Sequence, residues 1–509
     1  MRNELLVIPV PAQITLAEGD PFRLSGSTVI QVVSAVPAVP AAPTARAAPA
    51  APAAPAAAEV QSVAALLADS LTSDVGHRLA VSTSSDVDGA ITLELADDAD
   101  ADAAPEAYEL HIDSRRVLVR SAHPAGLFAG SQTLRQLVAA SKANGLALSA
   151  CDIADAPRYS YRGLSLDVAR RFFGVSDIER IIDHLALYKF NHLHLHLTDD
   201  QGWRLEIEGW PELTGIGAST SMYDGPGGFY TRDEYVSIVE YAQRRHLVIV
   251  PEVDLPGHVN AALVSYPMLA REGEVPQVFT GMEVGFSAVD VHKESTFQFV
   301  DDVVGKIAAM TPGPYLHVGG DEVHTLTDDE YTGFIERLER IVSSHGKRMI
   351  GWSEVAKASI STDVIAEYWD TNGDTSALVA AAKRGVKVIM APGTRTYLDM
   401  KYDEHTALGQ DWAGLIEVSD AYGWDPGLVI DGLPADAVLG VEAAIWTETL
   451  PAMADLEYML FPRLTAVAEV AWSAAGSLEW NSFRRRLRVH QARWTVEGTN
   501  FYLSPEVSA

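Results

Sequence analysis

Hydrophobic and polar positions follow two different rhythms along the chain, and the change comes at Pro157. Before it, short apolar runs with the two-residue period of strands are mixed with segments of helical period. Strands are expected at residues 5–11, 27–33, 91–95, 108–112 and 115–121, and helices at residues 59–71 and 126–138. Ser114-Arg115 lies between the last two strand-like runs and indicates a hairpin. This pattern predicts a small α+β domain at residues 1–155.

A stretch of almost only Ala and Pro interrupts this domain at residues 35–58. Prolines at this density break helices, and alanine side chains offer too little apolar volume to pack. We therefore expect a disordered, extended insertion here, with the first helix beginning after it at Glu59.

After Pro157, apolar runs of strand length alternate with helix-like segments. The expected strands begin at Tyr161, His192, Leu247, Tyr315, Arg348, Val364, Lys387 and Leu439. Capping boxes, in which a hydroxyl and a later carboxylate satisfy free backbone amides, mark helix starts at Ser176 with Glu179, Thr231 with Glu234 and Thr327 with Glu330. Eight strands alternating with helices predict an α/β fold, a (β/α)8 TIM barrel at residues 156–509 preceded by the smaller α+β domain.

Polar residues collect at the ends of the expected barrel strands. Six strands begin apolar and end in carboxylates or tryptophans, namely Asp199-Asp200, Glu252 with Asp254, Asp321-Glu322, Trp352 with Glu354, Trp369 with Asp370, and Trp446 with Glu448. The carboxyl ends of barrel strands converge on one rim, where barrel enzymes build their active sites. Because charged groups buried near one another are costly, packing does not explain this pattern, and we expect an active site at the rim.

The segment HVGGDE, residues 317–322, carries the strongest signal of chemistry. Its glycines allow a bend and a close approach, and Asp321 and Glu322 follow at the rim. In a partly apolar cleft, one acid of such a pair has a raised pKa, which suits proton donation near neutral pH. Glycosidases ordinarily place two carboxyl groups on either side of the scissile bond. Two residues that are neighbours in one chain are poorly placed to do this. Either a second carboxylate comes from another strand end (Asp199, Asp254, Glu354 or Glu448), or the nucleophile belongs to the substrate.

Composition and charge exclude some classes of binding partner. The 509 residues include 69 acidic and 38 basic ones, a net charge of −31, and there is no basic stripe. Such a surface repels phosphate backbones, so we expect no nucleic-acid partner. The chain has no uncharged apolar run of about 18 residues, so no membrane span is expected.

The cysteine content and the amino terminus bear on bonding and location. The single cysteine, Cys151, excludes an intrachain disulfide and a cysteine-rich zinc site. The first residues, MRNELLVIPVPAQ, lack the basic head, apolar stretch and cleavage site of a secretory signal. Unless a signal was trimmed, this start predicts a cytoplasmic protein.

Seven stretches resemble the motifs of the family 20 glycoside hydrolases, the β-N-acetylhexosaminidases. They are RGLSLDVARRFF, HLHLHLTDDQGWR, PEVDLPGH, HVGGDE, GWSE, TYLDMKY and IWTE, and they occur in that family's order. The region before Pro157, including GLFAGSQTLRQL, resembles the small domain that precedes the barrel in that family. The resemblance covers nearly the whole chain, and the Asp-Glu pair behind two glycines is its most diagnostic piece.

The resemblance implies hydrolysis of terminal non-reducing β-linked N-acetylhexosamine from oligosaccharides or glycoconjugates, by a retaining mechanism in which the substrate assists. Glu322 matches the residue that protonates the glycosidic oxygen and then acts as a base toward water. Asp321 matches the acid that orients the 2-acetamido group while its carbonyl oxygen forms an oxazolinium intermediate. Tyr397 matches the residue that hydrogen-bonds this carbonyl oxygen. No cofactor is implied.

The resemblance also assigns residues that hold the sugar. Arg170 matches the arginine that grips the 3- and 4-hydroxyls, which suits its planar fork of donors. The acids that bind the outer hydroxyls match Asp399 and Glu448. A network beside the proton donor, in which a carboxylate–histidine chain tunes protonation, matches Asp199, Asp254 and His258.

Tryptophans complete the expected pocket. Trp352, Trp369 and Trp446 match an aromatic box around the acetamido methyl and the sugar face, because an indole offers a flat apolar wall and one N–H donor. Trp412, in a long loop, is a weaker candidate for an outer subsite.

Parts of the sequence are compatible with two other function classes. His192, His194 and His196 lie on one side of a strand, like the H-x-H end of metal-dependent barrel hydrolases, but those enzymes need further histidines and an aspartate where this chain has Trp and Glu. Buried, hydrogen-bonded histidines are the default interpretation, and no metal is expected. A non-catalytic sugar-binding protein on the same scaffold would lose the acid, whereas Asp321 and Glu322 are both present. The sequence leaves the choice between GlcNAc and GalNAc, the linkage and the oligomeric state open.

Overall fold

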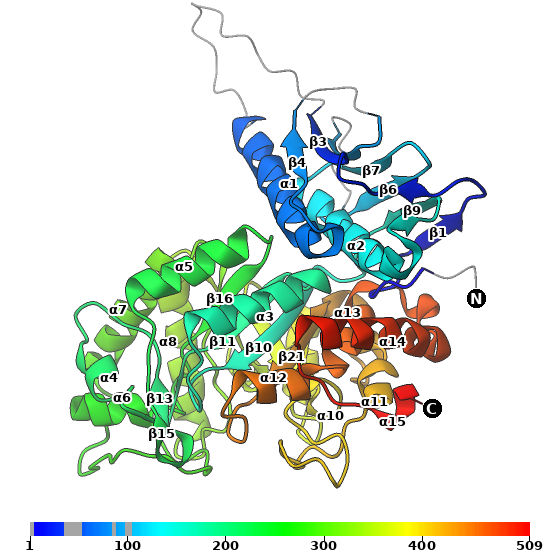
Figure 1. Ribbon diagram of the computed structural model, residues 1–509. Coiled ribbons are helices and arrows are strands. Elements are labelled where there is room, and N and C mark those ends of the chain that lie inside the picture. Colours follow the sequence, from blue (N-terminus) through cyan, green and yellow to red (C-terminus); the bar gives the residue numbers. More distant parts are fainter. Residues whose placement is uncertain (1–4, 35–52, 84–87, 97–103, 509) are drawn as a thin grey trace, which may run out of the picture.

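The computed structural model describes residues 5–34, 53–83, 88–96 and 104–508. It has two stacked bodies, a small amino-terminal one and a larger barrel (Figure 1). The chain passes through the small body first, then around the barrel, and its last long helix returns to lie beneath the small body. The predicted fold, a TIM barrel preceded by a smaller α+β domain, is confirmed.

The small domain is built on a seven-stranded sheet in the order β1-β9-β6-β7-β5-β3-β4. Its strands are β1 (Gln13–Leu16), β3 (Val29–Ser34), β4 (Ala80–Ser82), β5 (Ile91–Leu95), β6 (Tyr108–Ile112), β7 (Val117–Ser121) and β9 (Cys151–Asp155), and a separate pair joins β2 (Phe22–Arg23) to β8 (Ala147–Leu148). Strands β5 and β7 alternate fully and partly buried residues, as expected of strands with one face on a core. Strands β6 and β7 pair antiparallel, which confirms the hairpin expected at Ser114-Arg115.

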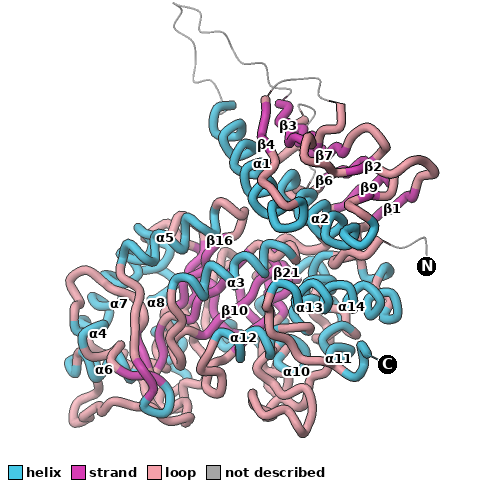
Figure 2. The backbone as a smooth tube through the Cα atoms, in the orientation of Figure 1, coloured by secondary structure: helices cyan, strands magenta, loops and turns pink. Residues whose placement is uncertain are grey.

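Two helices, α1 (Ala53–Val75) and α2 (Pro124–Ser141), pack on this sheet and on each other. They lie between the sheet and the barrel (Figure 2). Helix α2 approaches the sheet closely: a Cβ on Gly126 would lie 2.2 Å from Ser121 Oγ, and one on Gly130 would lie 2.5 Å from Val119 Cγ1. The packing distance therefore requires glycine at both positions.

The strand expected at residues 5–11 is absent, and this prediction is wrong. Val7 and Ile8 are buried, but the backbone N–H and C=O of Ile8 are bonded by the side-chain amide of Gln136, at 2.8 and 2.7 Å. A side chain of α2 thus satisfies the backbone groups that a neighbouring strand would otherwise satisfy.

The helix expected from Glu59 begins at Ala53, inside the Ala/Pro stretch, so the predicted boundary is also wrong. Proline is tolerated in the first turn of a helix, where the backbone N–H has no helical partner. Residues 35–52 of the stretch lie outside the described residues.

Eight parallel strands form a closed barrel in chain order. They are β10 (Tyr161–Asp167), β11 (His192–His196), β16 (Val248–Glu252), β17 (Tyr315–His317), β18 (Arg348–Trp352), β19 (Ile365–Tyr368), β20 (Lys387–Met390) and β21 (Val438–Ile445). Strand β10 closes the barrel by pairing with β21, with Tyr161 opposite Gly440. Each of the eight predicted strands is present.

Helices cover the outside of the barrel. The longer ones are α3 (Val175–Leu187), α5 (Arg232–Gln243), α7 (Glu294–Met310), α8 (Asp328–Ser344), α9 (Ser376–Arg384), α12 (Met453–Leu460), α13 (Arg463–Trp472) and α14 (Trp480–Glu497). Short elements lie in the loops and at the carboxyl end, namely α4 (Glu212–Gly215), α6 (Asn260–Ser265), α10 (Gly393–Thr396), α11 (Val418–Tyr422), α15 (Pro505–Ser508), β12 (Thr198–Asp199), β13 (Gly202–Trp203), β14 (Thr220–Ser221) and β15 (Gly225–Pro226). Within the described ranges, no helix has both the length and the apolarity to cross a membrane.

Two of the three predicted capping boxes are confirmed. Thr231 caps α5 and Thr327 caps α8, each by accepting from the backbone of the glutamate three residues later. The box predicted at Ser176 is wrong, because the residue that caps α3 is Gly174, two positions earlier. There the carboxylate of Asp177 accepts from the backbone N–H of Gly174 at 3.2 Å.

A buried polar junction ties the two domains together. Asp155, the last residue of β9, accepts hydrogen bonds from Tyr108 of the small domain at 2.7 Å and from Lys189 and Trp472 of the barrel at 3.0 Å each. These side chains are all buried. Because a buried ion pair is strongly destabilising when one partner is lost, this junction holds the two bodies in one orientation.

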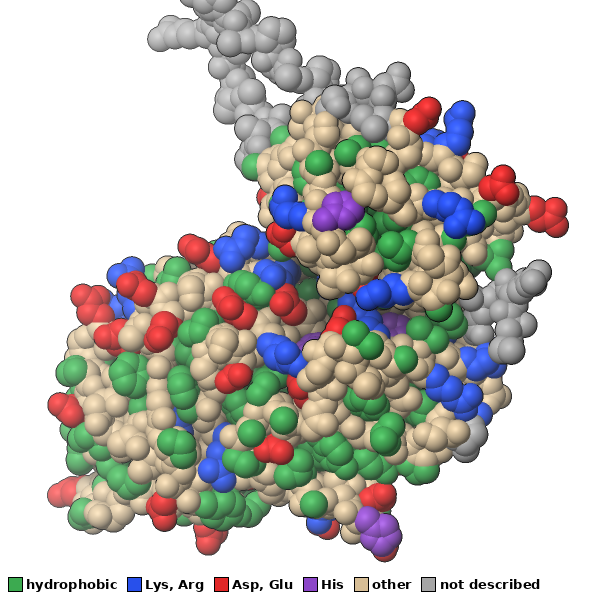
Figure 3. All heavy atoms as spheres, in the orientation of Figure 1, with side chains coloured by type: hydrophobic (Ala, Val, Ile, Leu, Met, Phe, Trp, Pro, Cys, Tyr) green, Lys and Arg blue, Asp and Glu red, His purple; other side chains and the backbone are tan. Residues whose placement is uncertain are grey.

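A cavity of about 950 Å³ also lies between the domains. Its lining includes Glu59 of α1, His192 at the start of β11 and Arg244 after α5. Figure 3 shows this hollow between the two bodies, with acidic and basic side chains interspersed over the barrel below it. Since His192 and Val248 begin their strands, the cavity lies at the opposite end of the barrel from the rim where the strands end.

Candidate active site

The segments that follow the barrel strands carry the residues assigned to the site. They are Arg170 after β10, Asp199 after β11, Asp254 and His258 after β16, Asp321 and Glu322 after β17, Trp352 at the end of β18, Trp369 after β19, Tyr397, Asp399 and Trp412 after β20, and Trp446 and Glu448 after β21. Parallel strands of a closed barrel end at the same rim. The structure therefore places all of these residues at one end of the barrel.

The backbone after β17 bends sharply to present the two neighbouring acids. Gly319 and Gly320 have φ values of +64° and +99°. A Cβ on Gly319 would lie 1.8 Å from Oδ1 of Asp254, and the N–H of Gly320 donates to the same oxygen at 3.0 Å. Asp254 occupies the space that a side chain would need, so glycine is required. Glu322 has a φ of +51°, a strained conformation for a residue with a side chain and one that collects at functional sites.

Asp321 and Glu322 differ in exposure. The side chain of Asp321 is 13% exposed, whereas that of Glu322 is 30% exposed. Nε2 of His258 lies 3.8 Å from Oδ2 of Asp321 and 3.5 Å from Oε2 of Glu322. Oδ1 of Asp321 is buried and has no hydrogen-bond partner within the described residues. The pair offers one enclosed and one accessible carboxyl group.

Burial raises the pKa of Asp321 well above its ordinary value, and the nearby carboxylate of Asp254 adds to the shift against the positive charge of His258. Burial likewise raises the pKa of Asp254 to about 7. A raised pKa in this pair was expected to suit proton donation. The pKa of Asp321, the acid matched to the acetamido group, is raised because its carboxyl is buried and has the carboxyl of Asp254 beside it.

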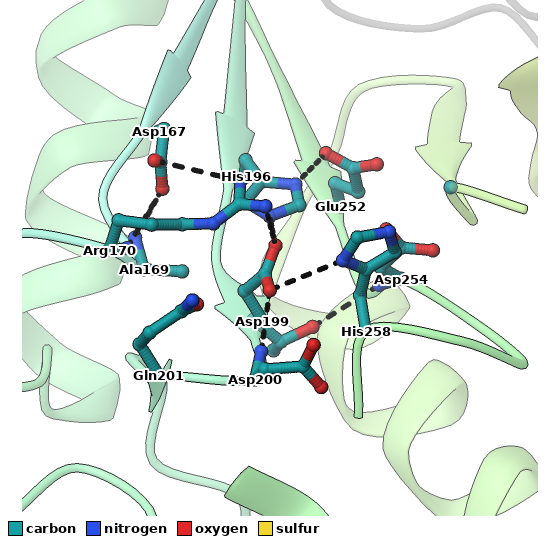
Figure 4. Close-up of polar contacts among 12 residues, drawn as sticks. Asp167, Ala169, Arg170, His196, Asp199, Asp200, Gln201, Glu252, Asp254 and His258 are labelled. Carbon is teal, nitrogen blue, oxygen red and sulfur yellow. Dashed lines mark hydrogen bonds and ion pairs between the residues drawn. The ribbon is translucent and has the colours of Figure 1, made fainter. Parts of the chain in front are cut away.

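Asp199 joins the two sides of the site (Figure 4). Its Oδ2 accepts from Nη2 of Arg170 at 2.8 Å and from Nε2 of His196 at 2.7 Å. Its Oδ1 accepts from the N–H of Asp200 at 2.6 Å and from Nδ1 of His258 at 3.3 Å. Burial alone would raise the pKa of Asp199, but the charges of Arg170 and His258 hold it well below its ordinary value. Asp199 is therefore an ionised carboxylate that positions Arg170 and His258.

Five aromatic side chains, which we call the aromatic row, line the rim: Trp352, Trp446, Tyr397, Trp369 and Trp412. The ring centre of Trp446 lies 6.0 Å from that of Trp352 and 6.2 Å from that of Tyr397. Tyr397 stacks on Trp369 at 6.4 Å, and Trp412 meets both edge-on at 5.7 and 6.1 Å. Trp352 is 1% exposed and Trp412 is 48% exposed, so the row runs from a closed floor to an open mouth.

Several buried polar atoms beside this row have no hydrogen-bond partner among the residues that the structure describes. They are Nε and Nη1 of Arg170, both carboxylate oxygens of Asp399, Oε2 of Glu448, Oδ1 of Asp321 and Nε1 of Trp352. Buried polar groups in folded proteins are nearly always hydrogen-bonded. Donors and acceptors gathered beside aromatic walls suit a ligand that carries both hydroxyl groups and apolar faces.

Comparison with known proteins agrees with this geometry. A family model described as "Glycosyl hydrolase family 20, catalytic domain" matches residues 159–331 and 324–475, and another described as "Glycosyl hydrolase family 20, domain 2" matches residues 4–156. The chain belongs to glycosyl hydrolase family 20. The resemblance that the motifs indicated is confirmed, and the chain is an enzyme of the β-N-acetylhexosaminidase class.

Relatives match over nearly the full length of this family 20 enzyme. A β-N-acetylhexosaminidase of Cellulomonas fimi is 42% identical over 506 residues, which cover 99% of this chain and 97% of that protein. The solved family 20 β-N-acetylhexosaminidase of Streptomyces coelicolor A3(2) has a TM-score of 0.89 at 41% identity and covers 98% of both chains. A mutant Streptomyces plicatus β-hexosaminidase in complex with its product GlcNAc has a TM-score of 0.89 at 42% identity, covering 99% of this chain and 97% of that one.

Three residues support the site of the family 20 enzyme in roles that were not predicted from the sequence. Asp167 accepts from the backbone N–H of Arg170 at 3.0 Å and fixes the turn that carries it. Glu354, considered only as a second carboxylate, accepts from Nε1 of Trp369 at 3.1 Å. His196 was interpreted as a buried core histidine, yet it contacts Asp199. Asp167 and Glu354 lie at strand ends inside the recognised motifs, which was the available signal.

Four groups of three side chains in the described parts could hold a metal ion, each with ligand atoms within 4.8 Å of one another. They are His194, His317 and Glu367; His196, Glu252 and Asp254; Asp199, Asp200 and His258; and Asp254, His258 and Asp321. The ring nitrogens of His196 already lie 2.5 Å from Glu252 and 2.7 Å from Asp199. A nitrogen that donates to a carboxylate offers no lone pair to a metal, which favours the hydrogen-bonded interpretation of this histidine.

Proposed function

We propose that this family 20 enzyme removes terminal, non-reducing β-linked N-acetylhexosamine residues from oligosaccharides or glycoconjugates. The reaction retains the anomeric configuration and passes through an oxazolinium intermediate formed by the substrate's own acetamido group. The observation that carries this proposal is the neighbouring pair of acids, Asp321 enclosed and Glu322 accessible, with His258 within 4 Å of both. No cofactor takes part in the steps that follow.

Three of the four strand-end carboxylates that could supply a second acid, Asp199, Asp254 and Glu354, are engaged in fixed contacts, which supports a nucleophile supplied by the substrate. Asp199 accepts hydrogen bonds on both oxygens, Asp254 accepts from the glycine bend, and Glu354 accepts from a tryptophan indole. Enzymes with a carboxylate nucleophile hold it about 5 Å from the acid, across the scissile bond. The two neighbouring acids instead flank one histidine, His258, and family 20 is among the families in which the substrate assists.

The division of labour follows from exposure. Glu322, the accessible acid, protonates the glycosidic oxygen and then removes a proton from the attacking water. Asp321, the enclosed acid, accepts the acetamido N–H while the carbonyl oxygen attacks the anomeric carbon. Positive charge that develops on the oxazolinium ring favours the ionised form of Asp321, which opposes the effect of its burial. Tyr397, within the aromatic row, donates its hydroxyl to the acetamido oxygen.

The pocket holds a single terminal sugar. Arg170 offers its unpartnered donors to the ring hydroxyls, and Asp399 and Glu448 offer acceptors. Burial raises the pKa of Asp399 well above its ordinary value, with the neighbouring charge of Glu448 adding to the shift, so a protonated Asp399 can donate as well as accept. Trp352 forms the closed floor against the acetamido methyl, and the exposed Trp412 contacts the sugar beyond the scissile bond.

Hydrolysis of a chromogenic β-N-acetylglucosaminide beside the matching plain β-glucoside tests this function. Because only the first substrate brings its own nucleophile, we expect it to be cleaved at least about a hundredfold faster. Comparable rates would defeat the acetamido mechanism. Proton NMR of the first-formed product should show the β anomer, and an α anomer appearing first would contradict retention.

A further inference from the structure

A line of buried side chains runs from the rim into the barrel, behind the residues that face the substrate. Glu252, the last residue of β16, has 0% exposure, and its Oε2 lies 2.5 Å from Nδ1 of His196 on the neighbouring strand β11. Nε2 of His196 in turn lies 2.7 Å from Oδ2 of Asp199. Figure 4 shows these three residues in sequence, with Arg170 and His258 as the other partners of Asp199.

This geometry determines the protonation of His196. Both of its ring nitrogens lie at hydrogen-bond distance from carboxylate oxygens, and a neutral imidazole has only one N–H to donate. The ring therefore donates from both nitrogens, as an imidazolium between Glu252 and Asp199. Electrostatics agree: burial alone would lower the pKa of His196, but Glu252 and Asp199 raise it well above its ordinary value.

The orientation of Asp199 depends on this arrangement. Its Oδ2 is shared by Arg170 and His196, and its Oδ1 by His258 and a backbone N–H. Arg170 belongs to the sugar-binding side of the site, and His258 lies beside the two acids. A change in the charge or orientation of Asp199 therefore affects both Arg170 and His258.

We propose that Glu252 is a positioning residue of this active site: it holds His196 in its doubly donating form and so fixes the orientation and charge of Asp199, and through Asp199 the placement of Arg170 and His258. This inference rests on the proposed function of those residues. Glu252 acts through His196 and Asp199 on Arg170 and His258, and it touches none of the reacting atoms.

Charged and titratable groups approach this line from several strands. Around Glu252 they are His194 and His196 of β11, His317 of β17, Glu367 of β19, and Asp254 after β16. Around Asp199 they are Arg170, His196, Asp200, Asp254, His258 and Glu448. His196 is the group bonded to both Glu252 and Asp199, so the effect of Glu252 on Asp199 passes through it.

The substitution Glu252→Gln removes the negative charge with little change in shape. His196 is then stable as a neutral ring, which accepts from the new amide and still donates to Asp199. With the positive charge gone, the ionised form of Asp199 is less favoured, so Asp199 takes up a proton at a higher pH than in the wild type. We expect the acidic limb of kcat/KM to shift upward by at least about half a pH unit, which lowers kcat/KM on that limb by about threefold or more.

Glu442→Gln is the matched control. Glu442 is equally buried on β21, but it bonds His194 at 2.8 Å and Tyr161 at 2.6 Å and has no hydrogen bond to His196. It should lower Tm to a similar extent while its acidic limb stays in place, because a structural role moves stability and not the pH profile. An unmoved limb in Glu252→Gln, or shifts of equal size in both variants, would overturn the proposal.

Two further measurements cover a Glu252 variant that does not fold. His196→Gln keeps an amide donor toward Asp199 without the positive charge, and it should move the acidic limb in the same direction. Neutron diffraction of the wild-type enzyme at neutral pH should show deuterium on both ring nitrogens of His196, and a single deuterium would refute the inference. Wild-type preference for the acetamido substrate is measured separately, so failure here is distinct from failure of the proposed function.

Discussion

Replacing the accessible acid by its isosteric amide, Glu322→Gln, isolates proton donation from every other role. The side chain is 30% exposed and lies 3.5 Å from Nε2 of His258, so the unfolding free energy should change by less than about 1 kcal/mol. General acid catalysis contributes about 10²–10⁴-fold, which corresponds to about 3–5 kcal/mol of the activation barrier. Turnover of a substrate whose leaving group is another sugar should fall by that factor.

The assay compares kcat/KM for a disaccharide with that for a dinitrophenyl glycoside, whose leaving group departs without a proton. The amide variant should lose far more activity on the first substrate than on the second. Glu354→Gln is the matched control, since Glu354 bonds Trp369 and should affect both substrates alike. Equal losses on the two substrates in Glu322→Gln would refute the assignment of Glu322 as the acid.

Three other perturbations test the packing and electrostatics of the site. Gly319→Ala places a Cβ 1.8 Å from Oδ1 of Asp254 at a φ of +64°, and it should lower the unfolding free energy by about 2 kcal/mol or more. Urea denaturation measures this loss against the control Gly333→Ala, whose Cβ meets no atom within 4 Å. Burial raises the pKa of Asp254 from 3.8 to about 7, so its contribution to stability is complete below pH 3.8 and is lost as the pH rises to 7. Asp254→Asn should therefore flatten the pH dependence of Tm between pH 3.8 and 7, and an unchanged slope would contradict the shift. Trp412 is 48% exposed, so Trp412→Ala should raise KM for longer oligosaccharides and leave Tm unchanged. Trp352 is 1% exposed, so Trp352→Ala should lower the unfolding free energy by about 3–5 kcal/mol. Equal losses of Tm in the two variants would contradict the placement of Trp412 at the mouth.

The eight barrel strands and the position of the acids were predictable because short, local stretches of sequence determine both. A buried strand from Tyr315 to His317, two glycines and an acid pair define a strand end wherever the barrel closes. The same holds for the capping boxes at Thr231 and Thr327. Local periodicity and chain-neighbour chemistry decide these features, so no distant contact is needed to recognise them.

Contacts between distant segments decided the remainder. Residues 5–11 are apolar and strand-like, but Gln136, more than a hundred residues later, takes up the backbone bonds of Ile8. The pKa of Asp321 is raised because the fold encloses its carboxyl and brings Asp254, from another strand end, beside it. Neither effect can be predicted from a local stretch of sequence.

His196 shows the same division most clearly. Its place in an alternating HLHLHL run puts it on the same side of the strand as His192 and His194, and the run is visible in the sequence. Whether such a histidine is neutral or charged depends on which carboxylates the closing of the barrel brings to its two nitrogens. The sequence by itself determined the barrel strands, their polar ends and the acid pair, while the tertiary structure decided the charge states, because burial and the distance between charges are properties of the folded chain alone.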